Sequence, residues 1–128
     1  MATVLLVEDH PMNRKLFRDI LGFEFEQVIE AETAAAAREI LLQTRPDLIL
    51  MDIQLPDLDG ISFVREIKAQ PMLASIPIIA VSAHAMKQDI DQARAAGCCD
   101  YVTKPITDDP FVLLERLKRS MISARPSS

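Results

Sequence analysis

Short apolar runs recur along the chain, and each is followed by polar residues that suit a loop. The clearest runs cover residues 3–7, 48–51 and 76–81. Runs of this length between turn signals are typical of strands buried on both faces of a parallel sheet. Residues 27–31 alternate polar and apolar, as an edge strand does, and residues 99–103 form a further short run. The pattern therefore predicts five strands.

The segments between these strands carry apolar residues at helical spacing. Pro11 suits a first helical turn, and Thr33 suits the N-cap of a second helix. Either Asp57 or Asp59 can cap a third helix. Gly97 supplies a left-handed stop for a fourth helix. These signals predict a helix after each of the first four strands.

The last two expected helices differ in their apolar faces. The fourth, over residues 86–96, has only Met86 and Ile90 as sizeable apolar anchors. Elements with few buried contacts open at low free-energy cost and are the ones that move. The last helix is expected to start at Pro110, and its buried face to consist of Phe111, Leu114, Leu117 and Met121.

Strands that alternate with helices imply right-handed crossovers and a doubly wound parallel sheet. The sequence therefore predicts an α/β fold with a five-stranded parallel sheet and five helices. No internal repeat or linker divides the 128 residues. We expect one domain over residues 1–122, a frayed tail over 123–128 and no output domain.

Composition narrows the classes of function. The net charge of -5 argues against nucleic acid as a partner, because phosphate binding needs a basic face. No apolar run approaches the roughly 20 residues that span a bilayer, and no signal peptide precedes the first strand, so we expect a cytoplasmic protein without membrane contacts. Adjacent Cys98 and Cys99 rarely meet disulfide geometry; we expect both to be small buried packing residues.

Polar side chains follow the expected strands at their carboxyl ends: Glu8, Asp9, Asp52, Ser82 and Lys104. If the first and third strands are neighbours, the three carboxylates share one pocket. A carboxylate pair about 4 Å apart repels by roughly 4 kcal/mol at an effective dielectric constant near 20. Proton uptake or a divalent cation relieves this repulsion. Oxygen donors suit Mg²⁺, with Mn²⁺ as a second choice.

This set of groups fits phosphoryl transfer to a carboxylate. Asp52 would attack phosphorus in line, while the cation and Lys104 neutralise the phosphoryl oxygens and Ser82 donates a hydrogen bond. Taken alone, Asp52 could equally be a solvated loop acid. The other strand-end residues favour the nucleophile.

The chain resembles the receiver domain of two-component response regulators over about residues 3–122. The matching motifs are the acid pair Glu8-Asp9, MDIQLPDLDG around Asp52, PIIAVSAHAM around Ser82 and YVTKPI around Lys104. Within that family these motifs are most similar to those of single-domain regulators of the DivK kind, and also to those of receivers attached to hybrid histidine kinases. The resemblance implies a flavodoxin-like fold with strand order 2-1-3-4-5.

The resemblance also implies roles for individual residues. Asp52 would be the phosphoacceptor. Mg²⁺ would be held by Asp9, by Asp52, by Glu8 through water and by the backbone carbonyl of Gln54. Ser82 and Lys104 would bind the phosphoryl oxygens.

Further expectations concern switching and phosphate lifetime. By the same resemblance, Tyr101 would be an aromatic switch coupled to Ser82, and the peptide before Pro105 would be cis. Gln54 and His84 each lie two residues beyond a site residue, so both could flank the water that hydrolyses the acyl phosphate. Ala83 is small and would leave the phosphoryl group open to a donor. These residues are our candidates for setting the phosphate lifetime.

We therefore expect a single-domain response regulator that is phosphorylated by a histidine kinase or a phosphotransfer protein. Its output would be a phosphorylation-dependent contact of the fourth helix, fifth strand and fifth helix with a downstream protein. An alternative is a phosphorelay shuttle, including one detached from a hybrid histidine kinase, and the sequence does not separate the two.

Two other classes fit less well. A Mg²⁺-dependent phosphohydrolase that resembles the haloacid-dehalogenase group would carry a second acid where Gln54 stands. A flavodoxin-like flavin binder would need hydroxyls and glycines where Glu8 and Asp9 would repel the flavin phosphate. We expect no enzymatic turnover beyond slow self-dephosphorylation.

Overall fold

The structure is a computed structural model that describes residues 2–84, 86–104 and 109–124, with the side chains after residue 122 excluded. The strands are β1 (Thr3–Val7), β2 (Gln27–Ala31), β3 (Leu48–Asp52), β4 (Ile78–Ser82) and β5 (Asp100–Thr103). The helices are α1 (Pro11–Leu21), α2 (Ala34–Gln43), α3 (Gly60–Lys68), α4 (Lys87–Ala96) and α5 (Pro110–Ala124).

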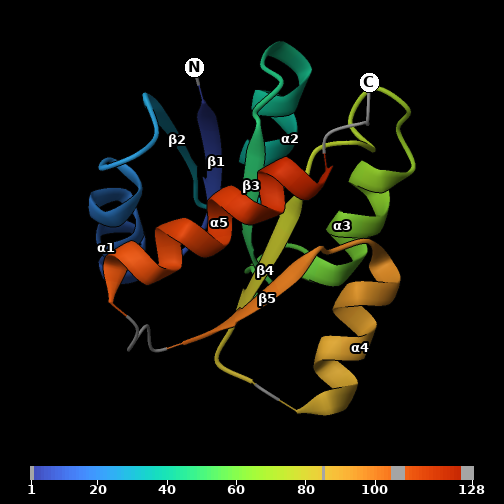
Figure 1. The fold of residues 1–128 in the computed structure, drawn as a ribbon. Helices are drawn as coiled ribbons and strands as arrows, with labels where there is room; N and C mark the ends of the chain where they lie inside the picture. The colour runs from blue at the N-terminus through green and yellow to red at the C-terminus, as the bar shows by residue number, and fades with distance from the viewer. Residues whose placement is uncertain (1, 85, 105–108, 125–128) are drawn as a thin grey trace.

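The strands form one parallel sheet in the order β2-β1-β3-β4-β5 (Figure 1). Both the fold class and the strand order are as predicted. Helices cover both faces, because successive residues of a strand point to opposite sides. Leu5 belongs to the apolar core beneath α2, α3 and α4, whereas Leu6 belongs to the core beneath α1 and α5. Because all strands run parallel, their carboxyl ends lie along one edge of the sheet.

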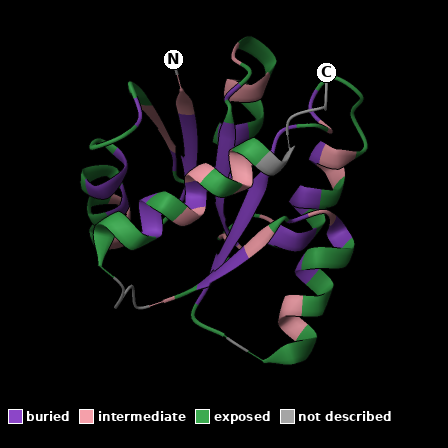
Figure 2. Ribbon diagram, in the orientation of Figure 1, coloured by how far each residue is buried: buried purple, intermediate pink, exposed green. Residues whose placement is uncertain are grey.

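Burial is greatest at the centre of the sheet, where β3 and β4 are buried along their whole length (Figure 2). β2 lies at the edge of the sheet, as predicted, and only its last residue, Ala31, is buried. The carboxyl ends of the two central strands therefore lie in the least solvated part of the sheet edge, and β3 ends there on Asp52.

Several boundaries differ slightly from the prediction. β4 begins at Ile78, because the preceding Pro77 has no N–H to donate to the ladder. β5 begins at Asp100, one residue later than expected. The backbone of α5 continues to Ala124, so two residues assigned to the expected tail are helical. No helix in the described part of the chain has the length and apolar character that a membrane span requires.

Three burial predictions are wrong. Phe111 is 62% exposed and lies beside Phe23, with ring centroids 5.9 Å apart, while Leu113 is buried near the start of α5. Met86 is the N-cap of α4 and is 63% exposed, so it does not anchor that helix. Cys99 is exposed, whereas Cys98 is buried as expected.

The two candidate caps of the third helix have separate functions in the structure. Asp59 caps α3, with Oδ1 accepting a hydrogen bond of 3.3 Å from Ile61 N. Asp57 instead reaches the amino end of α2, where its two oxygens accept bonds of 3.0 Å from the amides of Ala34 and Ala35. The loop after β3 is thereby attached to the helix before β3, which fixes the segment that follows Asp52.

Candidate functional site

Asp52 is the last residue of β3, and it is only 3% exposed. Its Oδ1 accepts a hydrogen bond of 2.9 Å from the backbone N–H of Gln54. Its Oδ2 lies 3.1 Å from the ammonium of Lys104. A buried carboxylate is unfavourable unless it is paired and hydrogen-bonded, and both conditions are met here.

Lys104 follows β5 and brings one cation to two carboxylates. Its Nζ lies 2.8 Å from Glu8 Oε1, in addition to its bond with Asp52. Partial burial opposes the charged form of this lysine. The hydrogen bond to Glu8 and the charge of Asp52 outweigh that effect and raise the pKa of Lys104 above its usual value. The ammonium therefore remains charged at neutral pH.

Glu8 and Asp9 follow β1, the neighbour of β3 in the sheet. Glu8 is 1% exposed, and its Oε2 accepts a bond of 3.2 Å from the N–H of His10. Burial, followed by the interaction with Asp52, raises the pKa of Glu8 to about 7. Proton uptake by Glu8 is therefore easier than for an ordinary carboxyl, and proton uptake is one of the two expected remedies for repulsion.

The same carboxylates fit a divalent cation, the second expected remedy. Glu8, Asp9 and Asp52 can each bring one oxygen within 4.8 Å of the others. All of these donors are hard oxygen atoms, which suit Mg²⁺ or Mn²⁺. Asp9, Asp52 and Lys104 also line an open cleft of about 450 Å³, together with His10, Asn13, Gln54 and Ala83. The cleft therefore opens Asp9 and Asp52 to small molecules from solvent, whereas Glu8 is not among its lining residues.

Ser82 and Tyr101 meet at the backbone of His84. Ser82 is 1% exposed at the end of β4, and its Oγ accepts a bond of 3.1 Å from His84 N. Tyr101 is 7% exposed, and its hydroxyl donates a bond of 2.6 Å to His84 O. Both side chains line a second cavity of about 360 Å³ that Gln54 borders as well. Ser82 therefore lines the second cavity and not the acid cleft, and Gln54 borders both.

Comparison with known proteins identifies the family of this chain. The sequence model of the response regulator receiver domain matches residues 4–118. The chain belongs to the response regulator receiver family. A curated relative, the polar-differentiation response regulator DivK of Brucella anthropi, is 41% identical over 110 residues, which are 86% of this chain and 89% of the relative.

Solved structures give the same assignment for the fold. The receiver domain of a signal transduction histidine kinase from Syntrophus aciditrophicus is 30% identical, with a TM-score of 0.86, and the match covers 100% of this chain and 96% of that chain. The receiver domain of the sensor histidine kinase PA1611 from Pseudomonas aeruginosa is 36% identical, with a TM-score of 0.82 and coverage of 94% and 97%. That structure has a magnesium ion coordinated in its active-site cleft.

One expectation about this receiver lies outside the described residues. Pro105 follows Lys104 directly, so the expected cis peptide remains a prediction. Arg14 contacts the loop after β1, and Asp57 attaches the loop after β3 to α2, but neither was identified from the sequence as a site residue. Their carboxylate and amide partners, Glu30 and Ala34, are more than 15 residues away along the chain and meet them only in the folded protein.

Proposed function

We propose that this receiver domain accepts a phosphoryl group on Asp52 from a phosphohistidine of a histidine kinase or phosphotransfer protein, and signals by a phosphorylation-dependent protein contact. The observation that carries the proposal is the nearly buried Asp52 carboxylate, which lies 3.1 Å from Lys104 and lines an open cleft. Transfer to a carboxylate needs such a nucleophile together with positive charge for the phosphoryl oxygens.

The proposed cation is Mg²⁺, which when bound neutralises charge on the transferring phosphoryl group. Its ligand set would comprise Asp9, Asp52, Glu8 through water and the backbone carbonyl of Gln54. The proximity of the three acids supports this set. The magnesium ion in the cleft of the PA1611 receiver supports the choice of metal.

In the proposed transfer, an Asp52 oxygen forms a bond to phosphorus. The bond between phosphorus and the donor imidazole nitrogen breaks, and its electron pair stays on that nitrogen. Lys104 would pair with a phosphoryl oxygen. Ser82 would donate the hydrogen of its hydroxyl, whose oxygen already accepts from His84. Since a carboxylate attacks without losing a proton, no general base is required.

The proposed output begins at the contacts of Ser82 and Tyr101 with His84. If Ser82 turns toward a phosphoryl group, its bond to His84 N is lost, and the loop that holds the Tyr101 hydroxyl can move. The second cavity is bordered by Asp89 and Gln92 of α4 and by Tyr101 of β5. The carbonyl of Tyr101 accepts a hydrogen bond from Arg116 of α5, so a change there would reach all three elements. This surface is the one that we propose for a downstream protein.

Hydrolysis of the acyl phosphate is proposed to be slow and to depend on three residues near the cleft. Gln54 and Ala83 line the cleft itself, and His84 lines the second cavity beside it. The side chain of Gln54 is an amide and cannot protonate a leaving group. This favours a signalling role over phosphohydrolase turnover.

The test is phosphorylation by radiolabelled acetyl phosphate in Mg²⁺, followed by mapping of the labelled residue. Asp52→Asn should abolish acid-labile labelling, whereas the matched control Asp19→Asn, which changes an exposed carboxylate of α1, should label like the wild type. Full labelling of Asp52→Asn would contradict the proposed phosphoacceptor.

A phosphorelay shuttle is the second candidate, and the similarity to receivers of histidine kinases favours it. Rapid return of label from the phosphorylated protein to a histidine phosphotransfer protein would support the shuttle. Capture of a downstream protein only in the presence of a phosphoryl mimic would support the switch.

A further inference from the structure

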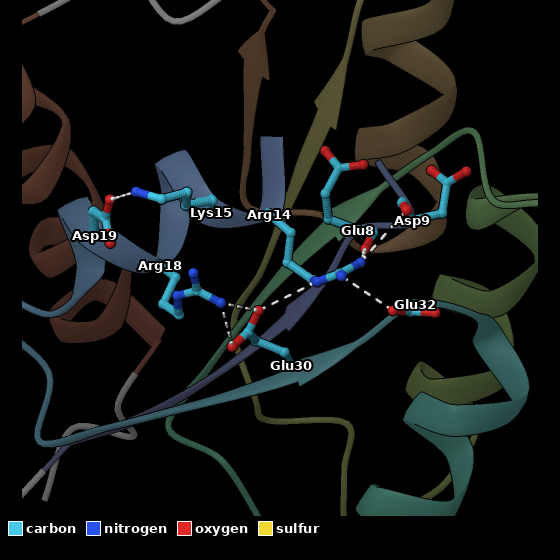
Figure 3. Close-up of polar contacts among 8 residues, drawn as sticks. All are labelled: Glu8, Asp9, Arg14, Lys15, Arg18, Asp19, Glu30 and Glu32. Carbon is cyan, nitrogen blue, oxygen red and sulfur yellow. Dashed lines mark hydrogen bonds and ion pairs between the residues drawn. The ribbon is translucent and has the colours of Figure 1, made fainter. Parts of the chain in front are cut away.

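Arg14 of α1 contacts the backbone of the segment that carries Glu8 and Asp9. Its Nη1 donates to Glu8 O at 3.3 Å and to Asp9 O at 3.4 Å. Its Nε lies 3.3 Å from Glu30 Oε1, and its Nη2 lies 3.0 Å from Glu32 Oε1. Figure 3 shows the guanidinium between the acid pair and these two glutamates. All three guanidinium nitrogens are therefore engaged.

This arrangement fixes the orientation of the Arg14 side chain. Glu30 belongs to β2, and Glu32 follows directly after it. A planar guanidinium held at two edges by carboxylates has little rotational freedom, so its third edge presents N–H groups in a fixed direction. The side chain is only 16% exposed, which limits competition from water.

The contact is with peptide carbonyls and not with the carboxylates that would hold a cation. The charge of Arg14 is already balanced by Glu30 and Glu32, so it neutralises the acid pair little. Arg14 must then affect the two acids chiefly by fixing the geometry of the backbone that carries them. Two carbonyls held at consecutive residues set the direction of both peptide planes, and hence the direction in which the Asp9 side chain leaves the backbone.

We propose that Arg14 is a positioning residue of the Mg²⁺ site, which holds the peptides of Glu8 and Asp9 so that their carboxylates converge with Asp52. The inference rests on the proposed Mg²⁺ binding at this site. Arg14 acts through the loop and does not touch the cation or the phosphoryl group. Partners of this kind orient the direct ligands, and their loss weakens metal binding.

Arg18 provides a matched control within the same network. It also pairs with Glu30, at 3.3 Å, but among the described residues it makes no hydrogen bond to the loop of Glu8 and Asp9. Its side chain is 45% exposed. Removal of Arg18 therefore changes the charge of the network while the hydrogen bonds to the loop remain.

The experiment is calorimetric titration of the full chain with MgCl₂, using wild type, Arg14→Met, Arg14→Lys and Arg18→Met. Arg14→Met should raise the Kd by about tenfold or more. Arg14→Lys should lose much of the affinity as well, because a lysine keeps the charge but cannot span two carbonyls and two carboxylates. Arg18→Met should stay within about twofold of wild type, as expected for an exposed pair.

A measurement at high salt separates position from charge. The loss in Arg14→Met should persist at about 0.5 M salt, where interactions between exposed charges are strongly screened. Unfolding midpoints without metal, measured for each variant, separate a change in affinity from a general loss of stability. If Arg14→Met does not fold, Arg14→Lys and Glu32→Gln replace it. Glu32→Gln removes the carboxylate that holds one edge of the guanidinium. Both variants should weaken Mg²⁺ binding.

The outcomes distinguish the inference from the proposed function. A wild-type protein that does not bind Mg²⁺ would overturn the proposed metal site itself. If wild type binds and the Arg14 variants bind equally well, the positioning role is wrong. An equal loss in Arg18→Met would also overturn it, and so would tighter binding in Arg14→Met, the direction that removal of a positive charge alone predicts.

Discussion

The Tyr101 hydroxyl donates a hydrogen bond of 2.6 Å to the backbone carbonyl of His84. This bond joins β5 to the segment after β4, across the cavity that borders α4. Ser82 holds the N–H of the same residue, so the position of His84 depends on one side chain from each of two adjacent strands. The segment is therefore attached at the point where the proposed signal begins.

Tyr101→Phe should lower the free energy of unfolding by about 1 kcal/mol, the usual net value of one hydrogen bond, because the ring keeps its packing. Urea denaturation would measure this loss, with an unchanged m-value. Amide exchange at His84 should become faster, whereas exchange in β2, on the far edge of the sheet, should not change. Equal stability together with equal protection of His84 would contradict a structural contribution from this bond.

At the start of α3 the backbone of Gly60 lies so close to the backbone of Asp52 and Ile53 that a side chain at this position would collide with it. A Cβ at this position would lie 2.5 Å from the Cα of Ile53 and 2.7 Å from the carbonyl oxygen of Asp52. Gly60→Ala must therefore displace the segment that follows the proposed phosphoacceptor. We expect the free energy of unfolding to fall by about 1–3 kcal/mol and labelling by acetyl phosphate to fall with it.

Gly22→Ala is the matched control for that substitution. Gly22 has a φ of -62°, and its nearest neighbour to a new Cβ is a carbonyl oxygen at 3.3 Å. Its effect on stability should be much smaller, and labelling should stay at the wild-type level. If Gly60→Ala were as mild as Gly22→Ala, close packing at Gly60 would not be what positions Asp52.

The sequence predicted the sheet well because its signals are local. Apolar runs bounded by polar residues mark buried strands, and the edge of a parallel sheet collects whatever follows them. Strand order places Glu8 and Asp52 at the ends of adjacent strands, whereas Lys104 follows β5, two strands from β3, and meets them through its long side chain. The reasoning failed where the outcome depended on packing. Helical spacing placed Phe111 on the stripe of Leu114, but spacing does not indicate how far the core extends beneath the first helical turn.

The tertiary contacts of Arg14 and Asp57 could not be predicted from the sequence either. Arg14 meets Glu30 and Glu32 only because α1 packs beside the edge strand, and no spacing along the sequence encodes that pairing. Asp57 looked like a cap for the next helix, yet it caps the preceding one. In both cases the residue type was informative, and the partner was set by the tertiary fold.

Glu8 makes the stability of the metal-free protein depend on pH. Burial and the nearby Asp52 raise the pKa of Glu8 to about 7, from an ordinary value of 4.5. The folded state therefore holds this proton to higher pH than the unfolded chain does. Its contribution to stability is complete below about pH 4.5, decreases as pH rises and is lost above about pH 7. Linkage makes the loss on the order of 1–3 kcal/mol.

Glu8→Gln isolates this contribution, because the amide resembles the protonated acid and does not titrate. Denaturation in the presence of a chelator should show that the variant gains stability relative to wild type as pH rises from about 5 to about 8. Other titrating groups are common to both proteins and cancel in the difference. Parallel stability curves across this range would show that Glu8 is ionised in the folded protein throughout, and that Lys104 alone compensates both buried carboxylates.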